Sequence, residues 1–304
     1  MTKSSTANGL ELIDQAIAST GATHVFGLFS GGDDSLTALS VAAQHPAFTA
    51  AVHIDTGIGV WDDPDDRRSV ARKFVERTCR ERGWPLLIYE AAKNSRADGT
   101  PDPQIYEALV LSHGFPGPTE VGHRIMYNRL KDRGIERLIR EHRQRRGQKF
   151  ILVAGCRSEE STRRMGNTKP CDMTRSSRGQ VWVNVIHDYT KRDCLDCIKR
   201  GGFERNPCSI KIHKSGECMC GAFAQDGELD CEIKLFYPEF VAYMRDLEQR
   251  VWDAGFPWRW DQRRPQWFED QQRGQAFMFD MKPDAPMPMC HKCAGGDDDQ
   301  ISAV

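Results

Sequence analysis

The stretch Ser30-Gly31-Gly32-Asp33-Asp34-Ser35 decides the fold class of this chain. It follows the largely apolar run from His24 to Phe29 and precedes a helical pattern over residues 36–43. This context predicts a strand, a tight glycine turn and the N-terminus of a helix. Two consecutive glycines let such a turn expose successive backbone N–H groups, and the helix dipole adds partial positive charge. We therefore expect the turn to bind a phosphate or a pyrophosphate.

The spacing of this turn separates it from other phosphate-binding loops. It matches neither the Gly-x-x-x-x-Gly-Lys-Ser/Thr loop of kinase-like NTPases nor the Gly-x-Gly-x-x-Gly dinucleotide fingerprint. Its pattern, Ser-Gly-Gly-x-Asp-Ser, resembles the PP-loop of ATP pyrophosphatases. The resemblance implies that the phosphates are held by Ser30, Gly31, Gly32, Asp33, Asp34 and Ser35. The commonest PP-loop has Lys where this chain has Asp33, which favours Mg²⁺ as the source of neutralising charge.

The pattern beyond the turn predicts further strands over residues 50–57, 84–89 and 149–154. They alternate with helical segments, among them residues 10–17 and 67–82, so we expect an α/β fold with a doubly wound parallel sheet. Ligands of such sheets bind at the carboxyl ends of the strands. Ser30, Asp55 and Gly155 would all lie there, and the Asp55 carboxylate would hold Mg²⁺ or the ribose of a nucleotide.

Two later segments add to the pattern. Residues 155–164 read Gly-x-Arg-x-x-Glu-Ser-x-x-Arg, and residues 185–193 read Val-Ile-His-Asp-Tyr-Thr-Lys-Arg-Asp. Together with the turn, they resemble the phosphoadenosine phosphosulfate (PAPS) reductase family of the adenine nucleotide alpha-hydrolase-like superfamily, over about residues 20–220. The resemblance implies an ATP or adenylyl-sulfate site. Asp34, Arg157 and Arg164 would be its catalytic residues, the two arginines holding the anionic end of the nucleotide or substrate.

One difference from the family pattern helps to choose between the reductase and ATP-cleaving functions. True reductases of this family carry a catalytic cysteine in a Glu-Cys-Gly-x-His segment, whereas this chain has Cys290-His291-Lys292-Cys293 near its end. The resemblance is therefore closer to branches that cleave ATP between the α and β phosphates and adenylate a substrate, such as enzymes of DNA phosphorothioation and tRNA sulfur transfer. Two alternatives are a thiol-dependent sulfonucleotide reductase and a non-catalytic nucleic-acid-binding module.

The charge of the chain is nearly balanced, with 42 basic against 43 acidic residues, so net charge predicts no partner. The stretch from Arg124 to Lys149, however, contains ten Lys or Arg and only three acidic residues. This stretch is either a DNA- or RNA-binding surface or a solvated helix face. No apolar run has membrane-spanning length and the N-terminus lacks a signal-peptide core, so we expect a cytoplasmic protein without membrane contact. A cysteine desulfurase is a candidate sulfur donor.

Eleven cysteines in a cytoplasmic chain indicate thiols or metal ligands rather than disulfides. Two short-spaced pairs, Cys218/Cys220 and Cys290/Cys293, would supply the four thiolates of a structural zinc site. An iron–sulfur cluster that includes Cys208 is the alternative. We accordingly expect a nucleotide-binding domain over 1–204, a small cysteine-rich metal-binding region over 205–294 with a helix near 238–254, and a disordered tail over 295–304.

Overall fold

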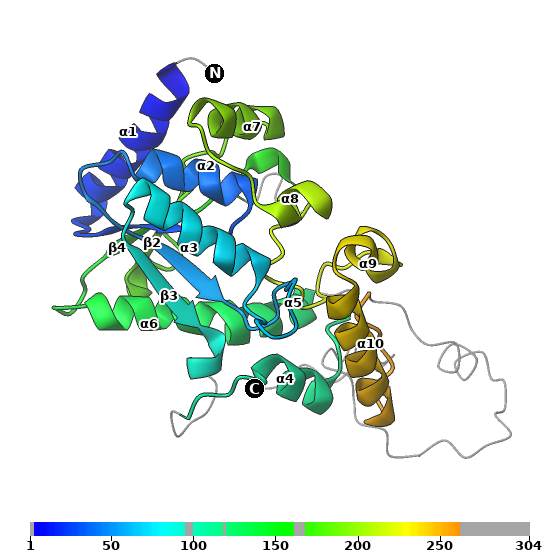
Figure 1. Cartoon of the computed structure of the whole chain (residues 1–304). Coiled ribbons are helices and arrows are strands. Elements are labelled where there is room, and N and C mark those ends of the chain that lie inside the picture. Colours follow the sequence, from blue (N-terminus) through cyan, green and yellow to red (C-terminus); the bar gives the residue numbers. More distant parts are fainter. Residues whose placement is uncertain (1–2, 95–99, 118–119, 161–167, 262–304) are drawn as a thin grey trace, which may run out of the picture. The chain divides into compact units, whose positions relative to one another are not determined.

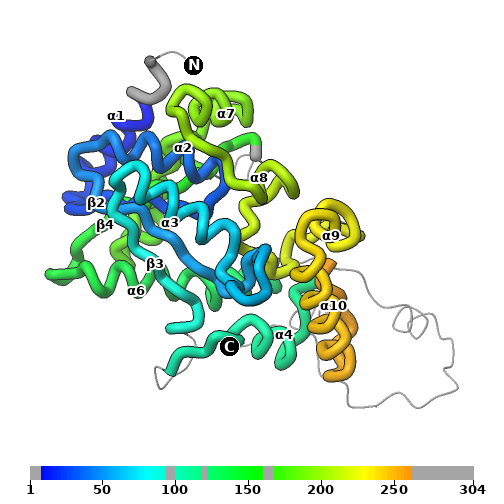
Figure 2. The backbone as a smooth tube through the Cα atoms, viewed as in Figure 1, coloured from blue at the N-terminus to red at the C-terminus, as the bar shows by residue number. Residues whose placement is uncertain are grey.

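The computed structural model describes residues 3–94, 100–117, 120–160 and 168–261 (Figures 1 and 2). The chain divides into two compact units. Unit 1 comprises Met1–Asp55, Arg68–Glu90 and Gly134–Glu217, and unit 2 comprises Thr56–Arg67, Ala91–Arg133 and Cys218–Val304. This grouping differs from the continuous ranges 1–204 and 205–294, and the assignment of those ranges as domains stays a prediction.

Unit 1 is built on one six-stranded sheet with the strand order β3-β2-β1-β4-β6-β5. Its neighbouring strands pair in parallel, except β5, which runs antiparallel to β6 at the edge of the sheet. The strands are β1 (Val25–Leu28), β2 (Phe48–Asp55), β3 (Leu86–Glu90), β4 (Phe150–Val153), β5 (Cys171–Asp172) and β6 (Gln180–Val183). Because β1 lies between β2 and β4, the direction of winding reverses there. The carboxyl ends of β1 and β4 are the position at which such sheets bind ligands.

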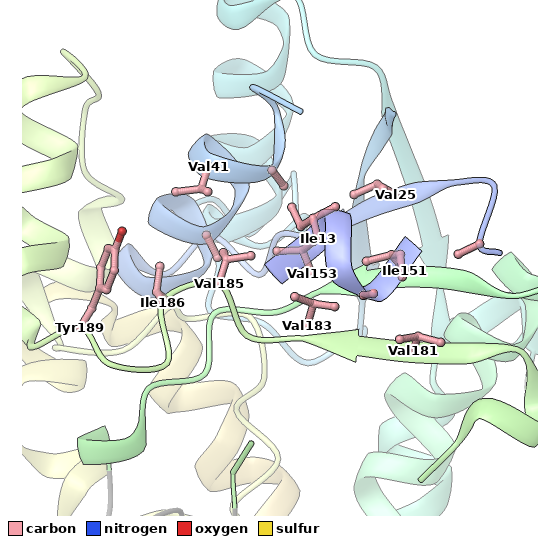
Figure 3. Close-up of a cluster of buried hydrophobic side chains, with 14 of the residues drawn as sticks. Ile13, Val25, Val41, Ile151, Val153, Val181, Val183, Val185, Ile186 and Tyr189 are labelled. Carbon is pink, nitrogen blue, oxygen red and sulfur yellow. The ribbon is translucent and has the colours of Figure 1, made fainter. Parts of the chain in front are cut away.

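Helices cover both faces of this sheet, which confirms the expected doubly wound α/β fold (Figure 1). On one face, side chains of α1, α2 and α7 pack with Val25, Ile151 and Val183 (Figure 3). The opposite face packs against α6 through Ile135, Leu138 and Ile139. The helices of unit 1 are α1 (Lys3–Thr20), α2 (Asp33–Ala42), α3 (Val70–Arg82), α6 (Arg133–His142), α7 (Lys191–Arg200) and α8 (Pro207–Lys211).

The expected strands are present, and their side chains alternate between the faces as the pleat requires. In β2, Ala51 packs with the α2 and α3 side chains, whereas Ala50 and Val52 pack with α6. Strands β5 and β6 were not predicted, because they are short and the chain around them carries polar residues and several charges. Helix α1 also extends beyond the predicted range 10–17 at both ends.

The described part of unit 2 contains the helices α4 (Ile105–His113), α5 (Glu120–Tyr127), α9 (Glu232–Phe236) and α10 (Pro238–Asp253). The predicted helix near 238–254 is thus present. The three chain segments of unit 2 are joined by specific contacts. Trp260 Nε1 donates to the Met219 carbonyl at 2.7 Å, and the Met219 N–H donates to the Ile58 carbonyl at 3.0 Å. The Tyr106 hydroxyl donates to the Cys220 carbonyl at 3.1 Å.

No helix within the described ranges is both long and apolar enough to span a bilayer.

Candidate active site at the carboxyl end of the sheet

The glycine turn leaves β1 and enters α2 as the sequence predicts. Gly31 has φ +83°, a left-handed conformation that side chains rarely adopt, and Gly32 is the N-cap of α2. The Ser35 hydroxyl donates to the Gly32 carbonyl at 2.9 Å, and the Ser30 hydroxyl donates to the Ser35 oxygen at 3.2 Å. The two serines therefore lie on the same turn, at the positive end of the helix dipole.

Gly155 follows β4 and lies against the backbone at the end of the turn. A Cβ atom at this position would come within 2.6 Å of the Asp34 carbonyl carbon and the Ser35 nitrogen. Such a distance is too short for any side chain, so glycine is required for the close approach of these two backbones. The two motifs that the sequence analysis placed at the carboxyl ends of β1 and β4 are in direct contact.

Asp34 is held by two cationic side chains from distant parts of unit 1. Arg157 Nε donates to Asp34 Oδ2 at 3.0 Å, and Arg157 is only 7 % exposed. Lys191 Nζ lies 3.3 Å from Asp34 Oδ1. The structure thus brings together two of the three predicted catalytic residues, and the third, Arg164, lies outside the described residues.

Asp33 has a different environment from the one that the loop pattern suggested. It is 4 % exposed, and Arg205 binds both of its oxygens, Nε to Oδ1 at 3.1 Å and Nη2 to Oδ2 at 2.8 Å. Lys191 Nζ adds an ion pair to Oδ2 at 3.0 Å. Burial raises the pKa of Asp33, but the hydrogen bonds from Arg205 and Lys191 outweigh this effect, so its pKa lies below the usual value.

Three cations therefore surround the two carboxylates of the turn. Arg157 and Lys191 pair with Asp34, and Lys191 and Arg205 pair with Asp33. Lys191 is the most accessible of the three, with a side chain that is 51 % exposed. The loop has Asp33 where the commonest PP-loop has Lys, and cationic side chains from other segments lie beside it.

The contacts of Lys191 and Arg205 with the turn are not predicted from the sequence. Lys191 begins α7, which Thr190 caps by accepting from the Asp193 N–H while the Asp193 carboxylate accepts from the Thr190 N–H. This capping box is visible in the third sequence motif, so the start of the helix was readable. Nothing in the sequence around Arg205 indicates its pairing with Asp33, which is a purely tertiary contact.

Asp55 ends β2, as predicted, but its carboxylate is engaged by an arginine. Arg72 Nη1 lies 2.5 Å from Asp55 Oδ2 and 3.0 Å from Oε1 of Glu90, the residue beside Asp55 on β3. Arg72 Nε also donates to Glu76 at 3.0 Å. The proposed role of Asp55 toward Mg²⁺ or ribose stays a prediction, and it would require Arg72 to share or release this oxygen.

A buried polar pair lies beside the end of β1. His53 of β2 is fully buried, with Nδ1 2.8 Å from the Phe29 carbonyl and Nε2 3.2 Å from Glu217 Oε2. Burial lowers the pKa of His53, but the charge of Glu217 and its hydrogen bond raise it further, so this pKa lies above its ordinary value. Both ring nitrogens face acceptors, which fits the doubly protonated imidazolium.

The predicted metal ligands are only partly covered by the described residues. Cys290 and Cys293 lie outside them, whereas Cys218 and Cys220 lie together in unit 2. The hydrogen bond between these two thiols, with burial, raises the pKa of Cys220 well above its usual value. Cys208, the residue of the iron–sulfur alternative, is buried in unit 1. Within the described ranges, no group of three or more His, Cys, Asp or Glu is arranged to hold a metal.

No family model and no curated protein matches the chain. Among solved structures, it is similar to the phosphoadenylyl-sulfate (PAPS) reductase of Candida auris, in a phosphate complex. The TM-score is 0.43 at 16 % identity, covering 65 % of this chain and 81 % of the reductase.

It is also similar to the U34-tRNA thiolase NcsA of Methanococcus maripaludis, whose structure contains a 4Fe–4S cluster. The TM-score is 0.45 at 14 % identity, covering 82 % of this chain and 79 % of the thiolase. Similarities of this size carry no assignment of activity. The chain resembles the PAPS reductase family in its motifs, and a PAPS reductase is among the solved structures to which it is similar.

Proposed function

We propose that the chain is an ATP pyrophosphatase, which cleaves ATP between its α and β phosphates and adenylates a substrate. The observation that supports this most strongly is the turn from Ser30 to Ser35. It lies where the winding of the parallel sheet reverses, at the N-terminus of α2, with Arg157, Lys191 and Arg205 around it. Backbone N–H groups, a helix dipole and three cationic side chains together favour a polyphosphate.

In this proposal the turn binds the β and γ phosphates, the part of ATP that leaves as pyrophosphate. An oxygen of the substrate attacks the α phosphorus, the bond from this phosphorus to the bridging oxygen breaks, and pyrophosphate carries away the electron pair. Charge that develops on the bridging oxygen is stabilised by positioned donors rather than by a covalent nucleophile. Mg²⁺ accompanying ATP would offset part of the negative charge that the phosphates bring near Asp34.

Lys191 is the residue best suited to exchange partners when ATP binds. Its ammonium group contacts both Asp33 and Asp34, and its side chain is the most exposed of the three cations. Burial lowers the pKa of Lys191, but Asp34 and Asp33 raise it further, so the lysine stays charged. A triphosphate offers more negative charge than these carboxylates, so Lys191 would turn toward it.

The test is release of pyrophosphate from ATP and Mg²⁺ by the purified full-length chain. Asp34→Asn should lower the rate by about a hundredfold, because it removes the charge that orients Arg157 and Lys191. Asp14→Asn is the matched control. Asp14 is an exposed carboxylate of unit 1 that pairs with His45, and its substitution should leave the rate unchanged.

The same preparation distinguishes the reductase alternative. If the chain releases sulfite from an adenylyl sulfate in the presence of a thiol reductant, and releases no pyrophosphate from ATP, it is a sulfonucleotide reductase and the proposed function is wrong. Equal rates for the wild type and Asp34→Asn would contradict the assignment of the turn.

The acceptor that we propose is a substrate of sulfur transfer or of nucleic-acid modification, as the family resemblance implies.

The basic stretch Arg124–Lys149 is divided between the units, since residues 134–149 belong to unit 1. Three of its cations have partners there. Arg137 pairs with Glu141, Arg143 donates to the Arg178 carbonyl, and Lys149 donates to the Ser176 carbonyl. DNA or RNA binding by this stretch stays a prediction.

A further inference from the structure

We propose that His53 and Asn206 are positioning residues that fix the direction of two backbone N–H groups in the phosphate-binding turn. This inference rests on the proposed function, since it concerns how the same turn receives the phosphates of ATP. Neither residue belongs to the sequence motifs from which the turn was recognised, and both act on it from other segments of unit 1.

His53 acts at the start of the turn. Its Nδ1 is 2.8 Å from the carbonyl oxygen of Phe29, the residue that precedes Ser30. A carbonyl only accepts, so Nδ1 must carry a proton and donate. The ring is held from its other side by Glu217, whose carboxylate is 1 % exposed and also accepts from the Ser69 hydroxyl at 2.7 Å. Ser69 caps α3, so this contact joins the turn to a neighbouring helix.

Asn206 acts in the middle of the turn. It is 1 % exposed, and its Nδ2 donates to the Gly31 carbonyl at 2.9 Å and to the Ser215 carbonyl at 2.8 Å. Its Oδ1 accepts from the Cys208 N–H at 3.0 Å, which caps α8. The amide group therefore has partners on both of its atoms, and the orientation of its Nδ2 toward Gly31 is fixed.

Peptide geometry converts these two carbonyl contacts into control of N–H groups. In a planar trans peptide, the C=O and the N–H of one unit point in opposite directions. The Phe29 carbonyl shares its peptide unit with the Ser30 N–H, and the Gly31 carbonyl shares its unit with the Gly32 N–H. When His53 and Asn206 hold the carbonyls toward the interior, these two N–H groups point the opposite way, where an anion can accept from them.

Both positioning residues, His53 and Asn206, contact the same short segment, residues 215–217. The Ser215 carbonyl accepts from Asn206, and Glu217 forms an ion pair with His53, so residues 215–217 support the turn at two places. The Ser215 side chain also lies near Gly32, where a Cβ atom would be 3.4 Å from the Ser215 Cβ. The turn needs this support because its two glycines have little conformational preference of their own.

Two substitutions of His53 separate the contact with the turn from the contact with Glu217. An asparagine amide nitrogen occupies nearly the position of Nδ1, so His53→Asn keeps a donor for the Phe29 carbonyl. A glutamine amide reaches the position of Nε2, so His53→Gln keeps a partner for Glu217 and loses the Phe29 contact. Both variants remove the imidazole from the same buried position, and we expect similar losses of stability.

The measurement is calorimetric binding of ATP with Mg²⁺, and of inorganic pyrophosphate with Mg²⁺, to the full-length chain. His53→Gln should weaken both affinities about tenfold, the effect of misorienting one N–H that donates to a charged oxygen, whereas His53→Asn should retain most of the affinity. Thermal melting of each variant checks that folding is comparable. His45→Gln is the control, because His45 is a buried histidine that pairs with Asp14 and not with the turn.

The outcomes separate this inference from the function on which it rests. A wild-type chain that binds neither ATP nor pyrophosphate would refute the proposed function. A wild-type chain that binds both, with equal affinities for His53→Gln and His53→Asn, would refute the positioning role. If both variants melt too early for calorimetry, Asn206→Ser replaces them. A serine oxygen can still cap α8, but the amide that donates to the Gly31 carbonyl is lost, so both affinities should fall, and affinities equal to those of the wild type would refute the positioning role.

Discussion

At the scale of single residues, Asp33 shows how far a loop pattern can be read. The loop pattern predicts that Asp33 holds phosphate, and this prediction uses only the position of the residue in the turn. In the structure, both of its oxygens are bound by Arg205 and it is almost completely buried. Its partner comes from a segment with no recognisable motif, so the ion pair with Arg205 is visible only in the tertiary fold, and the role of Asp33 toward phosphate stays a prediction.

Asp33→Asn should therefore lower stability as well as activity. The amide keeps the shape but removes the charge that Arg205 and Lys191 face, at a cost of about 2 kcal/mol at neutral pH. Because the folded pKa of Asp33 lies below its unfolded value, this contribution is fully present above the unfolded pKa and is lost as the pH falls through the folded pKa. Urea unfolding at a series of pH values should show the wild type and variant converging in acid.

The pair of the exposed Asp14 with the buried His45 supplies the comparison for that experiment. Asp14→Asn should change stability by less than about 1 kcal/mol, because a carboxylate that stays largely solvated contributes little. A loss for Asp33→Asn no larger than this, or one independent of pH, would show that the buried ion pair is not a source of stability.

At the scale of elements, the sequence predicts most of the sheet and fails at its short edge. Strand β2 and helix α3 have long, clear patterns, and α3 is bounded by the Ser69 cap and the left-handed Gly83. Strand β5 has only two residues, and β6 has four but begins with Gln180 and lies among polar residues, whereas the equally short β4 is apolar throughout. Strands without a continuous apolar run are formed by pairing with neighbours rather than by local preference, so a window of sequence does not reveal them.

Gly155 provides a prediction about how two elements meet. Gly155→Ala would place a Cβ atom against the Asp34–Ser35 backbone, which cannot move aside as a flexible side chain does. We expect a stability loss of about 1–3 kcal/mol and weaker ATP binding, since β4 and the start of α2 must separate. Thermal melting and ATP titration measure the two effects.

Gly147→Ala is the matched control for that experiment. Gly147 also belongs to unit 1 and has φ +78°, but nothing lies within 4 Å of a Cβ placed there. Its substitution should cost about 1 kcal/mol of backbone strain and leave ATP binding intact. If Gly155→Ala binds ATP as well as Gly147→Ala does, the close approach has no part in forming the site.

At the scale of the whole molecule, the order of residues conceals how the chain is grouped. Unit 2 collects three separate segments, two of which interrupt unit 1 after β2 and after β3. Composition shifts visibly only in the last of these segments, where cysteines are frequent. A boundary drawn from composition therefore finds that segment alone, because membership of the other two depends on contacts between distant residues.

The metal prediction belongs to this scale, because it joins Cys218 and Cys220 to a part of the chain outside the described residues. Four thiolates would form a closed zinc site whose ligands all contribute to stability. We expect about one zinc per chain by elemental analysis, lost in Cys218→Ser and retained in Cys231→Ser, whose cysteine is exposed in the same unit. Iron with acid-labile sulfide that depends on Cys208 would replace zinc by a cluster.

The strand order has a consequence for synthesis on the ribosome. Strand β1 is one of the two central strands of the sheet, and Val25 pairs on one side with Phe48 but on the other with Ile151. Until β4 emerges, one edge of β1 has no partner, and the growing chain exposes unpaired backbone groups beside Phe26 and Val25. Such an edge invites pairing with another nascent chain. Slow translation or the absence of a chaperone would therefore favour aggregation of the partly synthesised chain through the open edge of β1.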